Sequence, residues 1–375
     1  MKNSICIVTF PLGKSGRTPL LNLIKLFSEL VNEVYVVSGG EVLEELEDVE
    51  RVRFLKVTHK VSSNIFMRIF NYICTQLKIL QHTVKILKNV DLFIFFIGGE
   101  SLLIPILVLR LLGKRVLLMP AGIAAKVCFF KNDPFFKIIS LLISINSILV
   151  NRLILYSHSL INEGNFARYR GKIIIAHRHF VDFDRFILKK KINERLNLVG
   201  YIGRLSKEKG VLNLIEAIPL ILRERDDSYF VIIGHGNLTS KIRTMITAKH
   251  LDTYVKLTGW VSHKDIPLYL NELKLLILPS FTEGLPNIIL EAMACGTPVL
   301  ASPVGAIPDI IKEGETGFLL KSNEPKHIAK RTVELLKNPI ILEKVSINAY
   351  NYVRENFSYE KVLEIWRNIL SEFLR

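Results

Sequence analysis

The sequence predicts an α/β protein built from two doubly wound parallel sheets. Short apolar segments alternate along the chain with longer amphipathic ones, a pattern typical of strands and helices in βα units. The strands are apolar throughout rather than at every second residue, which favours parallel sheets covered on both faces. The length of 375 residues allows two domains, and 49% hydrophobic with 23% charged residues indicates a globular chain.

Thirteen apolar segments predict the strands, seven in a first domain and six in a second. We expect helices between them and at 325–337 and 340–375. The domains are placed at 1–185 and 186–355, with 356–375 as a separate C-terminal helix. The expected strands lie at 5–10, 33–38, 52–57, 91–97, 115–119, 152–156 and 172–175, and then at 198–202, 229–233, 254–258, 275–278, 298–301 and 317–320.

Two carboxylates follow the expected strand at 275–278. Glu283 lies in a Gly/Pro loop, and Glu291 lies about two turns into the next helix, which Gly296 and Pro298 end. Both positions are near the crevice in which open α/β sheets bind ligands. A carboxylate accepts paired hydrogen bonds, which suits the adjacent hydroxyls of a sugar.

A basic loop follows the expected strand at 198–202. Gly203, Arg204, Lys209 and Gly210 precede a helix N-terminus. The glycines let backbone N–H groups approach a ligand, the helix dipole favours an anion, and Arg and Lys bind phosphate oxygens. A phosphate cradle and hydroxyl-binding carboxylates in the same half of the chain indicate a sugar nucleotide.

With the supporting segments 231–236, 257–261, 303–309 and 314–318, these motifs resemble the retaining GT-B glycosyltransferases of family 4, the glycosyl transferases group 1. The resemblance covers 197–320 closely and the N-terminal half only in outline. It implies a hexosyltransferase that moves a sugar from a UDP- or GDP-sugar to a lipid-linked or polysaccharide acceptor in cell-surface glycan synthesis. It also implies that the last helix crosses back to the N-terminal, acceptor-binding domain.

The resemblance assigns a role to each motif. Arg204 and Lys209 would stabilise the diphosphate leaving group, Glu283 would hold donor-sugar hydroxyls, and Glu291 would hold the ribose. The remaining donor-binding positions are glycines and their neighbours: Gly13 and Gly16 near donor phosphate and acceptor, Gly203 in the cradle, Gly284 and Leu285 beside the sugar, and His235, Gly236, Trp260 and Val261 beside the base.

The chain departs from the family at one place. Many members have a histidine after the fifth N-terminal strand, where this sequence reads Met119-Pro120-Ala121-Gly122. The group that orients the acceptor is therefore unassigned. Two alternatives stay open: a nucleotide-sugar epimerase of the same fold, and a GT-B scaffold without catalysis.

The positive charge is concentrated in the N-terminal domain. Between Arg51 and Arg178 there are 19 Lys and Arg residues against four acids, which equals the whole chain's net charge of +15. Within this segment, 65–88 reads as a basic amphipathic helix that carries Arg68, Lys78, Lys85 and Lys88. We expect contact with an anionic membrane surface, assisted by aromatic and lysine residues at 126–137. Nucleic acid is a poorer candidate because no nucleic-acid motif accompanies the charge.

We expect neither a metal nor a cofactor. Asp182-Phe183-Asp184 spells a DxD motif but lies in the expected linker, and His177 and His179 lack a third ligand. The four cysteines are scattered without metal spacing, no apolar run reaches the length of a membrane span, and the N-terminus lacks a signal-peptide pattern. We therefore expect a cytoplasmic protein, peripheral on the inner face of the plasma membrane.

Overall fold

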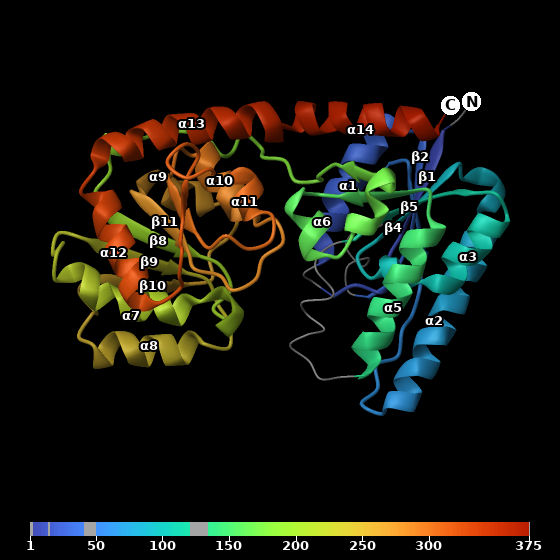
Figure 1. Cartoon of the computed structure of the whole chain (residues 1–375), viewed down its shortest axis with the longest axis horizontal. Helices are drawn as coiled ribbons and strands as arrows, with labels where there is room; N and C mark the ends of the chain where they lie inside the picture. Colours follow the sequence, from blue (N-terminus) through green and yellow to red (C-terminus); the bar gives the residue numbers. More distant parts are fainter. Residues whose placement is uncertain (1–2, 14–15, 41–49, 121–133, 375) are drawn as a thin grey trace. The chain divides into compact units, whose positions relative to one another are not determined.

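The computed structural model describes residues 3–13, 16–40, 50–120 and 134–374. The chain divides into two compact units (Figure 1). Unit 1 comprises Met1–Arg178 with Leu363–Arg375, and unit 2 comprises His179–Val362. Each unit contains one parallel sheet with helices packed around it, which confirms the predicted fold class.

The sheet of unit 1 has seven parallel strands in the order β3-β2-β1-β4-β5-β6-β7. The direction of winding reverses between β1 and β4. The strands are β1 (Ser4–Val8), β2 (Glu33–Ser38), β3 (Val52–Lys56), β4 (Leu92–Phe96), β5 (Arg115–Met119), β6 (Arg152–Leu155) and β7 (Ile173–Ile175). The helices are α1 (Arg17–Leu30), α2 (Ile65–Lys85), α3 (Leu103–Leu111), α5 (Pro134–Leu149) and α6 (Ser159–Glu163).

The sheet of unit 2 has six parallel strands in the order β10-β9-β8-β11-β12-β13, and its winding reverses between β8 and β11. The strands are β8 (Leu198–Ile202), β9 (Tyr229–Ile233), β10 (Val255–Gly259), β11 (Leu275–Leu278), β12 (Val299–Ala301) and β13 (Phe318–Leu319). The helices are α7 (Val211–Leu222), α8 (Thr239–Ala248), α9 (Ile266–Glu272), α10 (Asn287–Ala294), α11 (Ile307–Ile310), α12 (Pro325–Leu336) and α13 (Pro339–Phe357).

The central strands are buried on both faces, as their composition predicts. Every residue of β1, β4 and β11 is buried, because helices cover the sheet on each side. Burial on both faces explains why these segments are continuously apolar rather than alternating. All thirteen predicted strands form, each within two residues of its predicted bounds.

The C-terminal segment, predicted to be helical over 340–375 with 356–375 set apart as a separate helix, forms two helices. Helix α13 ends at Phe357, and α14 (Tyr359–Phe373) begins after Ser358, whose backbone is extended. The Val181 N–H donates to the Phe357 carbonyl, and Val181 forms a parallel bridge with Ser358. This pairing takes Ser358 out of the helical conformation. The exact position of the break depends on Val181, which lies far away along the chain.

The last part of α14 is anchored in the core of unit 1. Trp366 is fully buried, and its ring packs edge-on against Phe27 with centroids 5.0 Å apart. Its indole N–H donates to the His177 carbonyl at 3.1 Å. A buried indole needs such a partner, so this contact fixes the position of α14 on unit 1.

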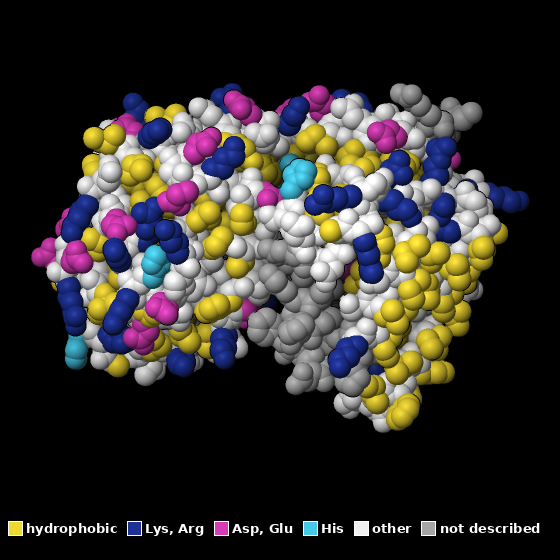
Figure 2. Space-filling view, in the orientation of Figure 1, with side chains coloured by type: hydrophobic (Ala, Val, Ile, Leu, Met, Phe, Trp, Pro, Cys, Tyr) yellow, Lys and Arg dark blue, Asp and Glu magenta, His cyan; other side chains and the backbone are white. Residues whose placement is uncertain are grey.

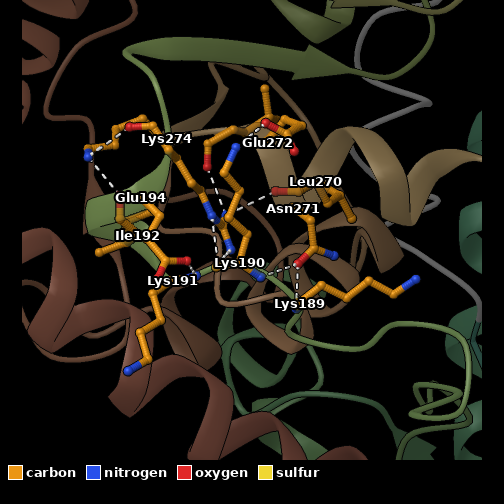
Figure 3. Close-up of polar contacts among 11 residues, drawn as sticks. Lys189, Lys190, Lys191, Ile192, Glu194, Leu270, Asn271, Glu272 and Lys274 are labelled. Carbon is orange, nitrogen blue, oxygen red and sulfur yellow. Dashed lines mark hydrogen bonds and ion pairs between the residues drawn. The ribbon is translucent and has the colours of Figure 1, made fainter.

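The segment before β8 is tied to unit 2 by buried polar contacts (Figure 3). The Arg195 guanidinium is buried and donates to the carbonyls of Lys190, Leu270, Leu273 and Cys295. Burial lowers the pKa of Arg195 to about 10. Asn271 holds the same segment, because its side-chain oxygen accepts from the Lys189 N–H at 2.7 Å.

We predict that Arg195→Ala destabilises unit 2. Removing the guanidinium leaves several buried carbonyls without a donor, at about 1–3 kcal/mol each. A loss of at least about 3 kcal/mol corresponds to a fall in Tm of about 6–12 °C for a unit of this size. Thermal unfolding of the full chain measures the change, with the exposed Arg223→Ala as the control. Equal Tm values for the two variants would contradict the structural role of Arg195.

Candidate functional site

The predicted site residues of unit 2 follow four neighbouring strands. Trp260, His235, Arg204 and Glu283 come after β10, β9, β8 and β11, which lie in that order in the sheet. Because the strands are parallel, their carboxyl ends meet at one edge. The cradle and the Glu283 loop flank the point at which the winding reverses, where open α/β sheets bind ligands.

Lys209 and Glu283 form an ion pair across this switch point. The Lys209 Nζ lies 2.6 Å from the Glu283 Oε2, and the Ser280 hydroxyl donates to Oε1 at 2.7 Å. The Glu283 side chain is only 8% exposed, against 24% for Lys209. The carboxylate is therefore held by two partners in a fixed orientation, with its remaining acceptor capacity available for hydroxyl groups.

Arg204 is the more exposed cation of the cradle. Its side chain is 63% exposed, and its guanidinium lies 3.8 Å from the Glu208 carboxylate. The Tyr201 hydroxyl donates to the Arg204 carbonyl at 2.8 Å, which fixes the backbone of the loop. A fixed backbone with an exposed guanidinium allows the side chain to reach an anion in solution.

Glycines bring the loops of adjacent strands into contact. Gly210 has a φ of +65°, and a Cβ there would lie 1.9 Å from the Pro279 carbonyl oxygen, after β11. Gly234 has a φ of +137°, and a Cβ there would meet the Gly203 carbonyl at 1.9 Å. Only glycine tolerates both the backbone conformation and the close approach. These positions therefore set the packing of the cradle between its neighbours.

The predicted base-binding residues lie along the same edge. The Leu205 N–H donates to the His235 carbonyl at 3.1 Å, which joins the cradle to the loop after β9. Gly236 continues this loop, and its N–H donates to the Thr239 hydroxyl at 3.0 Å. The Trp260 ring is 76% exposed, and Val261 beside it is half-buried.

Glu291 lies in α10 and is buried beside a residue that the sequence analysis did not identify. The Glu291 Oε1 lies 2.8 Å from the His263 Nε2. The His263 ring in turn packs on Phe186, with centroids 5.5 Å apart. His263 follows Trp260 and Val261 in the loop after β10. Its place beside two predicted donor-binding residues was the signal that could have identified it from the sequence. Nearby, Leu285 is buried, and the Gly284 carbonyl accepts from the Ala306 N–H at 2.9 Å.

The predicted glycines of the first loop lie in unit 1, after β1. The Gly16 N–H donates to the Gly13 carbonyl at 2.9 Å, which closes a turn before α1. Among the described residues, and apart from its chain neighbours, no atom lies within 4 Å of a Cβ built on Gly13. Pro120 follows β5 and is buried, but Ala121, Gly122 and the aromatic and lysine residues at 126–131 lie outside the described residues.

Unit 1 contains a pocket of about 310 Å³ at the carboxyl ends of β1, β3 and β4. Phe10, His59, Lys60, Arg68 and Tyr72 contribute to its wall. The Phe10 ring packs against His59 and Tyr72, with centroid separations of 4.8 and 5.6 Å. Burial and the nearby Lys78 lower the pKa of His59, so this imidazole is neutral at pH 7. The cations Lys60 and Arg68 suit an anionic group, and the aromatic rings offer apolar contact surface.

Arg178 follows β7 and is buried at the same edge of unit 1, and the sequence analysis assigned it no role. Its guanidinium lies over the rings of Phe96 and Tyr156, at 4.9 and 5.9 Å from their centroids. Burial lowers the pKa of Arg178 to about 10. Its Nε and Nη1 have no hydrogen-bond partner among the described residues. In contrast to Arg195, this arginine is buried without donating those bonds, which costs stability.

The described part of the chain contains no group of three or more His, Cys, Asp or Glu side chains that could hold a metal ion. Asp182 and Asp184 of the DxD motif are exposed, and the Asp182 carboxylate accepts from the Asp184 N–H at 3.1 Å. This contact is a local turn of the kind that Asp commonly makes.

Comparison with known proteins identifies the family of the domain that carries these residues. Residues 182–352 match the model of the family described as glycosyl transferases group 1. Unit 2 is a glycosyl transferases group 1 domain. The match covers the cradle, the Glu283 loop and Glu291, and it confirms the resemblance drawn from these motifs.

Curated relatives extend the comparison beyond the matched domain. The chain is 25% identical to an N-acetyl-alpha-D-glucosaminyl L-malate synthase of Bacillus anthracis, over 100% of this chain and 98% of that protein. It is 29% identical to the amylovoran biosynthesis glycosyltransferase AmsK of Erwinia amylovora, over 56% and 54% of the two chains. The chain spans about half the length of most of the curated relatives it matches.

A solved structure shares the fold over the whole chain. The Anabaena protein Alr3699/HepE, in complex with UDP, superposes with a TM-score of 0.78 at 18% identity, over 98% of this chain and 99% of that one. This similarity confirms the predicted GT-B fold for the two units.

We predict that Arg178→Met separates stability from activity. The described residues supply no acceptor for the Arg178 Nε and Nη1. Replacing this buried cation by an apolar side chain should therefore leave the free energy of unfolding unchanged or raise it by about 1–3 kcal/mol. Sugar transfer should fall, because the N–H groups that we expect to contact a ligand are removed. Thermal unfolding and turnover of the same preparation test both effects. A fall in Tm with unchanged turnover would show that Arg178 is structural.

Proposed function

We propose that this protein transfers a sugar from a nucleoside diphosphate donor to a hydroxyl group of a glycan acceptor, with retention at the anomeric carbon. The observation that carries the proposal is the Lys209–Glu283 ion pair beside Arg204, at the switch point of a group 1 domain. It places cations for a diphosphate next to an oriented carboxylate for sugar hydroxyls.

In the proposed reaction the bond between the anomeric carbon and the diphosphate oxygen breaks. The diphosphate leaves with the electron pair, and the acceptor oxygen forms the new bond. The acceptor proton passes to the departing diphosphate, so the step balances without a further reactant. Arg204 and Lys209 stabilise the developing negative charge on the diphosphate, which is an electrostatic contribution to catalysis.

The proposed donor is a UDP- or GDP-sugar. UDP is the better candidate, because the structurally similar Anabaena protein was solved in complex with UDP. In this proposal Glu291 binds the ribose hydroxyls with help from His263, which lies 2.8 Å away. The exposed Trp260 ring and the His235–Gly236 loop bind the base. Thermal-shift screening of nucleotide sugars identifies the donor.

The proposed acceptor is a lipid-linked or polysaccharide glycan of the cell surface, bound by unit 1. Relatives that act in amylovoran synthesis support this class. The pocket with His59, Lys60 and Arg68 offers aromatic and cationic groups for an anionic glycan. The concentration of positive charge in 51–178 further supports work at the inner membrane face.

Incubation with the donor alone distinguishes this function from the alternatives. A transferase needs an acceptor before it releases the nucleoside diphosphate, apart from slow hydrolysis. An epimerase would convert the donor without any acceptor. Donor binding without turnover across a panel of lipid-linked acceptors would favour a non-catalytic scaffold.

We predict that Arg204→Ala and Lys209→Ala each reduce kcat by about 10²–10³, because each removes charge stabilisation of the leaving group. Glu283→Gln should also lose activity, since it weakens charge-assisted hydrogen bonds to the sugar. Lys207→Ala, an exposed lysine of the same loop, is the matched control. Steady-state kinetics on the four variants tests the site, and wild-type kcat/KM in Arg204→Ala and Lys209→Ala would disprove it.

The two cation variants should differ in stability. Arg204 is exposed, and substitutions of exposed residues usually cost little stability. Lys209→Ala, however, leaves the buried Glu283 carboxylate without its cation. It should therefore lower Tm more than Arg204→Ala does, so activities are compared at a temperature at which both variants are folded.

We predict that transfer needs no divalent cation. Arg204 and Lys209 supply positive charge at the proposed diphosphate site, and the Asp182 carboxylate is engaged in a local turn. Full activity should persist in EDTA, and Asp182→Asn should behave as the wild type. A strict Mg²⁺ or Mn²⁺ requirement that Asp182→Asn abolishes would overturn this prediction.

A further inference from the structure

We propose that one face of unit 1 inserts into the interfacial region of a lipid bilayer with anionic headgroups. We call this surface the apolar face. It consists of exposed apolar side chains on three helices: Phe66, Met67, Phe70, Ile73, Leu77 and Val84 of α2, Leu107, Leu111 and Leu112 at α3, and Ile138, Leu141 and Ile148 of α5. Figure 2 shows hydrophobic side chains gathered over the region of α2 and α3.

Helix α2 exposes apolar side chains and buries polar ones, which is the opposite of an ordinary surface helix. Its exposed stripe carries Phe66, Phe70, Ile73, Leu77 and Val84, at the three- and four-residue spacing of one helix face. Phe66 is 79% and Phe70 60% exposed. Its buried residues are Tyr72, Thr75, Gln76, Ile79 and Thr83, most of which are polar. The predicted basic amphipathic helix therefore forms, but much of its apolar stripe points outward.

Hydrogen bonds hold α2 in this orientation. The Gln76 side chain accepts from the Ile104 N–H at 2.9 Å, which fixes the start of α3. The Tyr72 hydroxyl donates to the Ser101 carbonyl at 2.8 Å, and the Thr75 hydroxyl lies 2.8 Å from the His59 Nδ1, outside the helix. Rotating α2 to bury the apolar stripe would break the contacts of Tyr72 and Gln76 and leave buried polar groups unpaired.

The apolar face is continuous rather than a scatter of single residues. Helix α3 packs against both α2 and α5, so their outer surfaces adjoin. Single exposed apolar residues are normal on soluble proteins, but contiguous patches mark interaction sites. No helix among the described residues is long and apolar enough to cross a bilayer.

The charge around the apolar face is complementary to anionic lipid. Helices α2, α3 and α5 carry five Lys and Arg residues and no Asp or Glu. Lys78, Lys85 and Lys137 are exposed on these helices, and Lys88 is exposed just beyond α2. Helices that lie in a membrane interface typically carry Phe and Leu on one side and Lys and Arg beside them.

The same charges argue against a protein partner. Lysine is depleted in protein–protein interfaces, whereas it is enriched around membrane-surface helices. A symmetric dimer through this face would bring together two copies of helices that carry Lys and Arg but no Asp or Glu. Like charges in contact oppose that arrangement.

The proposal adds to the proposed function a place for meeting a lipid-linked acceptor, and it uses no residue of the donor site. The two proposals can therefore fail independently.

Insertion of apolar side chains also differs from attraction by charge alone. Salt shortens the Debye length from ~10 Å at 0.1 M to ~3 Å at 1 M, which weakens charge attraction but not apolar burial. Binding should consequently retain a salt-resistant component.

Cosedimentation of the full chain with phosphatidylcholine vesicles containing phosphatidylglycerol tests the proposal at low and high salt. The triple variant Phe66→Ser, Phe70→Ser and Leu77→Ser should reduce partitioning at least about 100-fold at both salt concentrations. The variant Lys78→Ser, Lys85→Ser and Lys88→Ser should lose about 100-fold at low salt but little at high salt. Both should keep the wild-type Tm and donor binding, since the mutated side chains are exposed.

The matched control removes comparable apolar side chains from unit 2. Leu196, Ile340 and Ile347 are 73%, 80% and 53% exposed, and their replacement by Ser should leave partitioning unchanged. Three results would overturn the proposal: wild-type protein that ignores these vesicles, binding that high salt abolishes, or wild-type partitioning by the apolar-face variant. A wild-type dimer that this variant converts to a monomer, without vesicle binding, would assign the face to a second copy.

Discussion

The parallel pairing of β8 with β11 is the constraint on which the donor site depends. These strands are neighbours in the sheet although β9 and β10 lie between them in the chain. The reversal of winding leaves the loops after both strands facing one crevice, because helices cannot cover that point. Lys209 and Glu283, 74 residues apart, consequently meet at 2.6 Å. The same principle places the first-loop glycines and the unit 1 pocket beside β1 and β4.

Two buried arginines differ in whether their N–H groups have hydrogen-bond acceptors among the described residues. Arg195 donates to carbonyls from several segments, so its burial is compensated and it fixes the chain before β8. Arg178 contacts the Phe96 and Tyr156 rings but leaves Nε and Nη1 without partners among the described residues. The acceptors of Arg195 explain its structural role, whereas the described residues supply no acceptor for the Arg178 Nε and Nη1.

Unit 1 and unit 2 differ in how their exposed apolar side chains are distributed. The large exposed apolar side chains of unit 2 include Leu196, Trp260 and Ile340, which lie on separate elements. In unit 1 they gather on α2, α3 and α5, where acidic residues are absent. The polar inner side of α2 stabilises this arrangement through contacts such as Gln76 with Ile104. The helix thereby keeps its apolar stripe outward at no cost in unpaired groups.

The sequence by itself determined the strands, the fold class and the loops that carry Arg204, Lys209, Glu283 and Glu291, because apolar periodicity, glycines and helix ends are local signals. Only the tertiary structure decided which of these residues meet. The Lys209–Glu283 and Glu291–His263 contacts depend on strand order, and the break at Ser358 depends on pairing with Val181. The sequence also left open whether the apolar stripe of α2 faces the core or solvent, because periodicity defines a stripe on a helix but not the direction in which it points.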